Sequence, residues 1–343
     1  MSAVDVVAVI GTCGPERRRH AALVAHELGR QLLPASLLSG SPDPVEEAAV
    51  LASWMDEDAG AVIEVPDEIP ATELIGTFAE RSDRTRLSGV VCVVDAVHIL
   101  ADLRRDDDIP LRDAGSGLAA PLAPRALLSV AQIEYASAIV LVNWSGLPKT
   151  ELTTLMALLS HLSPRARLRL RSTESTYPGD VHAYTSEQDR AGWLAVLNGE
   201  LDPVMTDPRV SAFRYEQVRP FHPGRLKRAL DLRVEVGEFG TLVRSAGFCR
   251  LATRPQVVAQ WDHVGRVISV TPRAYDAGLS AEEELLAVGQ DIALIGLDLD
   301  RAGLVAALDE AVLTDRELAA GAEAWARFAD PFPAWPSAYG RSR

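Results

Sequence analysis

Residues 6–18 have the sequence VVAVIGTCGPERR, and this stretch decides the fold. Its first five residues, Val6 to Ile10, are apolar without polar alternation, which is typical of a strand buried on both faces of a parallel sheet. A turn with two glycines follows, and a helical pattern runs from His20 to Gln31. A strand, a glycine-rich turn and a helix in this order predict the first unit of a doubly wound α/β domain.

The alternation of strands and helices continues over the first half of the chain. Further buried strands are predicted at residues 61–65, 90–94 and 138–142, and helices at residues 71–81, 127–136 and 149–162. This spacing favours a doubly wound, mostly parallel sheet with helices on both faces. We assign residues 1–172 to this domain. Residues 173–208, which begin with a polar stretch containing Pro178-Gly179, are assigned to a linker.

The second half of the chain predicts a different domain. Strands are expected from Val210 onward and at residues 242–252, 260–270 and 291–295, with helices at residues 222–232 and 302–313. This order predicts an α+β domain over residues 209–330. The remaining tail, residues 331–343, contains three prolines and no periodicity.

Composition limits the classes of function. The chain has 343 residues, 48% of them hydrophobic, and a net charge of −14, which disfavours a surface that attracts nucleic acid as a whole. No apolar run reaches the roughly 18 residues of a membrane span. The first residues lack the basic segment of a secretory signal, and the three cysteines are too far apart to suggest a disulfide framework. We therefore expect a cytoplasmic protein with no membrane partner and no direct contact with DNA.

The turn after the first strand lies where a phosphate-binding loop belongs. Such a loop has the pattern G-x-x-x-x-G-K-[ST], in which backbone N–H groups hold the phosphates, the lysine neutralises them and the hydroxyl holds Mg²⁺. In this window Glu16 replaces the second glycine of the motif. Arg17 occupies the position of the lysine, and Arg18 occupies the position of the Ser or Thr that carries the hydroxyl. The degenerate nucleotide-binding residues are Gly11, Gly14, Arg17 and Arg18, and we interpret them as an inherited structural turn.

A second nucleotide motif is altered in the same way. The strand at residues 138–142 leads into Asn143. At this point GTPases carry the motif N-K-x-D, whose Asp binds guanine. In this chain Gly146 occupies the position of that Asp. Asn143 is therefore the last member of the degenerate nucleotide site. The seven histidines show no metal-ligand spacing on one helix face, and no G-x-S-x-G motif is present. We predict no catalytic residue and no metal ligand.

Five segments carry a resemblance to a known family. They are LSGVVCVVDAVHILADL (87–103), LLSVAQIEYASAIVLVN (127–143), FRYEQVRPFHPGRL (213–226), VRSAGFCRLATRP (243–255) and IGLDLDRAGLVAALDEAVLTDREL (295–318). With these segments the chain resembles the CobW family of P-loop GTPases and metallochaperones over nearly its full length. The resemblance implies a P-loop NTPase-like first domain followed by an α+β domain of the CobW C-terminal type.

Two elements of that family differ in this chain. The cysteine motif G-C-x-C-C has no counterpart before the strand at residues 61–65, and Glu64 stands at the E-x-S-G switch element with Pro66 and Asp67 in place of Ser and Gly. The ending WARFADPFPAW (325–335) is similar to an actinobacterial branch of the family. That branch includes the mycobacterial factor that recruits a hibernation-promoting protein to ribosomes under zinc limitation, so the resemblance implies a ribosome-linked role.

Positive charge is concentrated in the second domain. Residues 209–254 hold ten basic and four acidic residues, although the whole chain is acidic. This excess is consistent with a solvated strand face or with a contact surface for an acidic partner. For the second alternative, the candidate partner-binding residues are Arg219, His222, Arg225, Arg228 and Arg244. A separate row of arginines at positions 165, 167, 169 and 171 predicts an edge strand protected by charge.

These observations lead to a main hypothesis and two alternatives. The main hypothesis is a non-enzymatic adaptor on a GTPase scaffold that works without GTP, Mg²⁺ or zinc. Its partner would be a protein or a ribonucleoprotein, such as a ribosome or a hibernation factor. The first alternative is a GTP-binding CobW-type metallochaperone with a weakened nucleotide site. The second is a small-molecule enzyme that reuses the same pocket.

Overall fold

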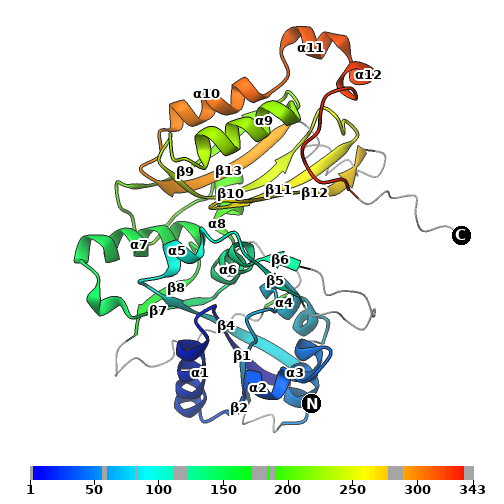
Figure 1. Cartoon of the computed structure of the whole chain (residues 1–343). Helices are drawn as coiled ribbons and strands as arrows, with labels where there is room; N and C mark the ends of the chain where they lie inside the picture. The colour runs from blue at the N-terminus through cyan, green and yellow to red at the C-terminus, as the bar shows by residue number, and fades with distance from the viewer. Residues whose placement is uncertain are drawn as a thin grey trace, which may run out of the picture. The chain divides into compact units, whose positions relative to one another are not determined.

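The computed structural model describes residues 3–55, 60–81, 84–111, 122–171, 184–185, 190–276 and 289–335. The chain folds as two compact units, coloured from blue to green and from green to red in Figure 1. Unit 1 comprises Met1–Ala195 and Leu201–Asp207, and unit 2 comprises Val196–Glu200 and Pro208–Arg343. The linker predicted at residues 173–208 lies partly outside the described residues. Its described part includes the short helix α8 (Gly192–Leu197).

Unit 1 is built on a six-stranded parallel sheet. Its strands are β1 (Val4–Ile10), β2 (Gln31–Leu33), β3 (Ala61–Glu64), β4 (Thr85–Asp95), β7 (Ala138–Val142) and β8 (Arg167–Leu170), in the order β2-β3-β1-β4-β7-β8. Every neighbouring pair in this sheet is parallel. The fold class predicted from the strand–helix alternation is confirmed. A separate antiparallel pair joins β5 (Asp108–Pro110) and β6 (Leu122–Pro124).

Helices cover both faces of this sheet. They are α1 (Gly14–Leu28), α2 (Ala35–Leu38), α3 (Pro44–Ser53), α4 (Ala71–Glu80), α5 (Ile99–Asp102), α6 (Arg125–Glu134) and α7 (Lys149–Leu162). Val7 and Val9 belong to the same buried cluster as Val24 of α1. Val6 and Ala8, which point to the opposite face, are also buried. Because successive side chains of a strand point to opposite faces, their common burial explains why the sequence shows no polar alternation.

The arginine row at residues 165–171 does lie at a sheet edge. Strand β8 is the last strand of the order, and Arg167 and Arg169 are exposed while Leu168 and Leu170 are half-buried. Charged side chains on an edge strand hinder pairing with other chains. The predicted edge strand is confirmed.

Unit 2 is a five-stranded antiparallel sheet with helices. Its strands are β9 (Val210–Gln217), β10 (Thr241–Cys249), β11 (Val257–Val264), β12 (Val267–Tyr275) and β13 (Gln290–Leu297), in the order β12-β11-β10-β13-β9. The helical elements are α9 (Pro223–Ala229), the π-helical turn η2 (Leu230–Val234), α10 (Arg301–Ala311), α11 (Asp315–Ala320) and α12 (Ala322–Trp325). Within the described residues of both units, no helix is long and apolar enough to cross a membrane.

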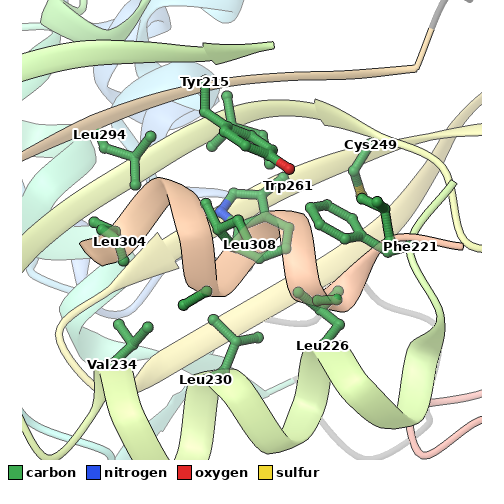
Figure 2. Close-up of a cluster of buried hydrophobic side chains, with 14 of the residues drawn as sticks. Tyr215, Phe221, Leu226, Leu230, Val234, Cys249, Trp261, Leu294, Leu304 and Leu308 are labelled. Atoms are coloured by element: carbon green, nitrogen blue, oxygen red, sulfur yellow. The ribbon is translucent and has the colours of Figure 1, made fainter. Parts of the chain in front are cut away.

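The core of unit 2 lies between the sheet and the helices α9 and α10. Leu226, Leu230 and Val234 point into this core from the α9–η2 segment, and Leu304 and Leu308 enter it from α10 (Figure 2). The three residues of the α9–η2 segment are spaced by four, so they occupy one face of the helix. The opposite face of this segment therefore faces solvent.

Three elements differ from the sequence expectation. The strand expected at residues 260–270 is a hairpin of two strands, β11 and β12, which turn at Gly265 with a φ of 58°. The helix expected at residues 222–232 ends in the π-helical turn η2. Helix α1 begins at Gly14, six positions before His20, because Pro15 is well suited to the first turn of a helix.

His263 on β11 predicts an acid-sensitive unit 2. Burial, with a smaller contribution from Arg244, lowers the pKa of His263 to about 4 from an ordinary value of 6.5. Between these values the unfolded chain binds more protons than the folded chain, so the free energy of unfolding falls as the pH drops from 6.5 to 4. The loss attributable to this group is about 3 kcal/mol at the acid end of the window.

We expect His263→Leu to remove that part of the pH dependence, measured by urea denaturation at a series of pH values between 7 and 4. His26→Gln, at an exposed position on α1, is the matched control. If the His263→Leu protein and the wild type lose stability with the same pH profile, the assignment to His263 is wrong.

Candidate functional site

The polar side chains of unit 1 gather where the parallel strands end. Strands β1, β3 and β4 end at Ile10, Glu64 and Asp95, and Asn143 follows the last residue of β7. In open α/β sheets, ligands bind at the carboxyl ends of the strands. We therefore treat this edge as the candidate site and call it the carboxyl edge, defined by Gly11–Arg18, Glu64, Asp67, Asp95, His98 and Asn143.

The turn between β1 and α1 is tight. Only residues 11–13 separate the strand from the helix, which starts at Gly14. Gly11 has a φ of 136°, and a Cβ atom at this position would lie 2.3 Å from the carbonyl oxygen of Val93, so only glycine fits. Glu16 is already part of the first helical turn. The predicted degenerate loop is therefore a short turn whose backbone follows the neighbouring strand β4 closely.

Arg17 turns inward beneath this turn. Its side chain donates to the carbonyl oxygen of Gly11 at 2.6 Å and to Oδ1 of Asp67 at 3.3 Å. Its Nε atom lies 3.7 Å from Oε1 of Glu64, which is 1% exposed, while Arg17 itself is 4% exposed. The other carboxylate oxygen of Glu64 accepts from the backbone N–H of Ala35 at 3.1 Å. Arg17 is therefore neutralised inside the protein by carboxylates at the end of β3.

Two buried atoms of this ion pair lack a hydrogen bond to any residue that the structure describes. They are Nε of Arg17 and Oε1 of Glu64, which face each other across a gap too long for a hydrogen bond. The exposed side chain of Arg18 reaches Oε1 of Glu64 at 3.9 Å from the outside. Buried polar groups without partners cost free energy, so a donor and an acceptor left in this state mark a place where a ligand would gain hydrogen bonds.

A second polar group forms at the ends of β4 and β7. Asn143 has a φ of 57°, in the left-handed region that asparagine tolerates better than most residues, and its side-chain amide donates to Oδ2 of Asp95 at 2.8 Å. Nδ1 of His98 lies 3.1 Å from the same oxygen. Burial by itself would raise the pKa of Asp95, but hydrogen bonds from Asn143, His98 and the N–H of Val97 lower it overall. The hydrogen bond to Asp95 and its charge raise the pKa of His98.

Cys13 lies at the same edge but is not a prepared metal ligand. Its thiol donates to the carbonyl oxygen of Val93 at 3.3 Å. Burial, followed by the charges of Glu16 and Asp95, raises the pKa of the Cys13 thiol to about 11. Across the described parts of the chain, no group of three or more His, Cys, Asp or Glu residues is arranged to hold a metal ion.

The second predicted nucleotide motif forms a short helical turn. Gly146 lies in the short 3₁₀ helix η1 (Trp144–Gly146), and Nε1 of Trp144 donates to the carbonyl oxygen of Arg171 at 3.0 Å. Trp144 therefore ties this turn to the chain just beyond β8. The described residues 143–146 of this turn include no carboxylate, so the Asp of N-K-x-D has no counterpart in it.

The predicted partner-binding residues of unit 2 have mixed roles. Arg225 makes two hydrogen bonds to the carboxylate of Glu317, at 2.7 and 2.8 Å, and Arg219 pairs with Asp315. Arg244 is buried and pairs with Asp262. His222 caps the start of α9 by accepting from the N–H of Arg225, and its ring stacks on Phe328 at 4.4 Å between centroids. Of the five, Arg228 alone is exposed without an ion pair to any residue that the structure describes.

The basic excess of residues 209–254 is balanced within unit 2. Other arginines of the segment pair with acidic residues outside it, namely Arg209 with Asp298, Arg214 with Asp291, Arg250 with Asp276 and Arg254 with Asp330. Residues 208–343 hold 17 basic and 18 acidic residues in all, a net charge of −1. The local count of basic residues therefore does not correspond to an excess of positive charge in this part of the chain.

The comparisons with known proteins agree with this architecture. Residues 210–312 match the family model described as the cobalamin synthesis protein cobW C-terminal domain. The matched residues make up most of unit 2, which is therefore similar to the CobW C-terminal domain. The match and the relatives described next support a relation of this chain to CobW-type proteins.

Two curated relatives are similar over most of the chain. The zinc-regulated GTPase metalloprotein activator 1 of Dictyostelium discoideum is 26% identical over 286 residues, covering 76% of this chain and 59% of that protein. The zinc chaperone Rv0106 of Mycobacterium tuberculosis is 26% identical over 279 residues, covering 73% and 62%. The chain spans about three-fifths of the length of these relatives. The Zn(II)-bound YjiA GTPase from E. coli aligns over 91% of this chain and 100% of its own at 17% identity, but with a TM-score of 0.36 that likeness carries no argument.

These relatives correct one expectation from the sequence. We expected no role for GTP, Mg²⁺ or zinc, on the basis of Glu16, Arg18, Gly146 and the missing cysteine motif. That expectation is contradicted, because one relative is named a zinc-regulated GTPase and another a zinc chaperone. An altered motif shows that a binding site has changed. It does not show that the site has lost its ligand. The comparisons support the metallochaperone alternative better than the adaptor hypothesis.

Sequence reasoning missed part of the carboxyl edge. Asp95 and His98 were not singled out, although Asp95 directly follows the buried run VVCVV and therefore had to lie at the end of that strand. This position was a usable signal. The inward orientation of Arg17 had no such signal in the sequence. Its partners Glu64 and Asp67 lie about 50 residues away and are brought near only by the pairing of β1 with β3.

The buried Arg17–Glu64 pair predicts a specific pattern of stability changes. Arg17→Ala leaves the buried carboxylate of Glu64 without its charge partner, and removing one member of a buried pair typically costs about 3–5 kcal/mol. The double variant Arg17→Met with Glu64→Gln removes both charges and keeps an acceptor for the N–H of Ala35. We expect it to be more stable than Arg17→Ala alone, measured by equilibrium urea unfolding.

Arg18→Ala is the matched control, since Arg18 is exposed and its long contact with Glu64 should contribute less than about 1 kcal/mol. Equal losses for Arg17→Ala and Arg18→Ala would show that Arg17 does not hold Glu64 in the way described.

Proposed function

We propose that this chain is a CobW-type metallochaperone with a weakened nucleotide site, which carries zinc as its cargo and binds GTP with Mg²⁺ at the carboxyl edge. The names of the relatives support both ligands, and the CobW C-terminal domain supports the class. The relatives are longer than this chain, so their activity comes to it only as part of this proposal.

The unsatisfied Arg17–Glu64 pair is the observation that carries the nucleotide part. A phosphate bound to Mg²⁺ presents negative oxygens beside a positive ion, and the edge offers cations and carboxylates side by side. Arg18 is exposed and free to face phosphate, and Arg17 would reach it after releasing its contacts with Gly11 and Asp67. Glu64 and Asp67 are of the type that binds Mg²⁺. When bound, GTP would supply the free energy of its hydrolysis to a change of shape in the protein.

Several features of the same edge weaken binding. Glu16 places a carboxylate in the first turn of α1, where a phosphate would gain from the positive end of the helix. Arg17 must also exchange its contacts with Asp67 and Gly11 for contacts with a ligand. The turn at Gly146 supplies no carboxylate for guanine, so we expect little discrimination between GTP and ATP.

Zinc fits this chain as cargo. Asp95 and His98 offer one oxygen and one nitrogen donor at the carboxyl edge, and resident zinc sites use three or four protein ligands. A pair of donors binds zinc weakly and leaves coordination positions open for a receiving protein. The adaptor hypothesis is less well supported, since most of the arginines it relied on are paired within unit 2.

The nucleotide part predicts a thermal shift. A ligand at ten times its dissociation constant adds about 1.4 kcal/mol of stability, which corresponds to a rise of about 3–5 °C in Tm for a unit of this size. We expect GTP with Mg²⁺ and ATP with Mg²⁺ both to raise the Tm at high concentration. The double variant Arg17→Met with Glu64→Gln is the control and should show no rise. No nucleotide-dependent rise in the wild type, or the same rise in the control, would overturn the nucleotide part.

The zinc part is tested separately by equilibrium dialysis against zinc. His98→Ala should reduce bound zinc several-fold, and His26→Ala, which changes an exposed histidine on α1, should leave it unchanged. Both variants alter exposed side chains and should cost less than about 0.5 kcal/mol of stability. Equal zinc binding by wild type and His98→Ala would remove the carboxyl edge as the place where cargo is held.

A further inference from the structure

Unit 2 contains a groove that the proposed function does not use. It lies between the α9–η2 segment and α10, with a volume of about 230 Å³. Its floor is formed by Ala229, Ala307 and Ala311, and Leu232 stands at its side. Pockets for drug-sized ligands are usually about 300–1,000 Å³, so this space suits one inserted side chain better than a cofactor.

The groove belongs to the outward face of the α9–η2 segment. Leu226, Leu230 and Val234 take the inward face into the core, as Figure 2 shows. Leu232 is left 64% exposed, and Val236, in the turn that follows η2, is 69% exposed. The segment contains the π-helical turn η2, and such turns are rare and frequently occur at functional sites. Exposed apolar side chains beside a small apolar groove are typical of a protein contact.

Charge on the rim of the groove is mostly positive. Arg225, Arg228 and Arg233 line it together with one acidic residue, Glu310. Arg225 is held by Glu317, whereas Arg228 is exposed and makes no ion pair with the described residues. Arg233 pairs with Glu238 on one side and with Glu310 on the other. Glu310 is 73% exposed, so an incoming carboxylate could replace it at Arg233 while the Arg233–Glu238 pair persists.

We propose that this groove binds an acidic, leucine-bearing segment of a protein partner. A leucine side chain of the partner inserts between Leu232 and the alanine floor, and flanking carboxylates contact Arg228 and Arg233. The apolar contact supplies affinity and the charges supply orientation and rate of association. The proposal does not depend on GTP or zinc, so it can fail without affecting the proposed function.

RNA is another class of macromolecule that arginines attract, and the groove fits RNA less well than an acidic peptide. None of its lining residues is aromatic, so it offers no surface on which a base could stack. The net charge of −14 on the chain also repels a polyanion at a distance, whereas a short acidic segment has less charge to repel. RNA is therefore kept as an outcome of the test.

The test is fluorescence anisotropy with the full chain and labelled synthetic probes. The main probe is a peptide in which glutamates flank leucines. Three comparison probes are the same peptide with serine for leucine, the same peptide with lysine for glutamate, and a single-stranded ribo-oligonucleotide. We expect the glutamate–leucine peptide to bind, the serine version to bind at least several-fold more weakly, and the lysine version and the oligonucleotide not to bind.

Variants then assign the binding to the groove. Arg228→Glu should weaken binding of the main probe about tenfold, because it replaces an attraction with a repulsion. Leu232→Ser should weaken it by a similar factor. Glu310→Gln should strengthen it about two- to threefold, since it removes the carboxylate that competes for Arg233. Arg273→Glu is the matched control: Arg273 is an exposed arginine on β12 that does not line the groove.

Four binding results would overturn the proposal, and so would a fifth result, self-association. They are no binding of the main probe, equal weakening by Arg228→Glu and Arg273→Glu, equal binding of the serine version, and binding of the oligonucleotide in place of the peptide. If the free protein self-associates and Arg228→Glu abolishes that association, the occupant of the groove is a second copy of the chain. This result would also overturn the proposal. Circular dichroism melts of each variant show whether a loss of binding is a loss of fold, and Glu310→Gln tests the groove by a gain that unfolding cannot produce.

Discussion

The burial of both faces of the sheet in unit 1 is the constraint on which the rest of that unit depends. Most side chains of β1, β3, β4 and β7 are buried, and the runs at residues 90–94 and 138–142 are wholly apolar. Polar groups can therefore be accommodated only where the strands end and the backbone turns away. Glu64, Asp95 and Asn143 stand at such ends, on three different strands. The sheet brings these residues together, although they are far apart in sequence.

The architecture was largely predictable from the sequence, because hydrophobic periodicity reports burial directly. The strand at 138–142 and the helix at 149–162 were placed with their correct ends, since a polar residue or a proline borders each of them. The hairpin of β11 and β12 was missed because its turn, around Gly265, interrupts two apolar strands only briefly. The short strand β2 was missed because three residues are too few to show a period.

The candidate site was less predictable, because charge in sequence does not report pairing in space. Residues 209–254 show a clear basic excess, but the acids that balance it come from residues 262–330 and are brought beside it by the antiparallel sheet and by α11. An arginine on a strand with an aspartate on the next strand is a stabilising cross-strand pair. Local charge counts therefore overestimated the positive surface. Of the five residues expected to bind a partner, only Arg228 is exposed without an ion pair to a described residue.

Arg17 and Arg233 show how an arginine can hold a site closed without abolishing it. A lysine is a single flexible charge, whereas the planar guanidinium of Arg17 contacts Gly11, Asp67 and Glu64 together. A ligand at the carboxyl edge must therefore compete with an internal carboxylate, and its affinity is reduced by the free energy of that exchange. The groove of unit 2 has the same arrangement, since Glu310 pairs with Arg233 there and the proposed partner would have to displace it. In both places an acidic residue of the protein occupies the position that we propose for an anionic ligand. The strength of each internal pair then sets how acidic or how concentrated an external ligand must be to bind.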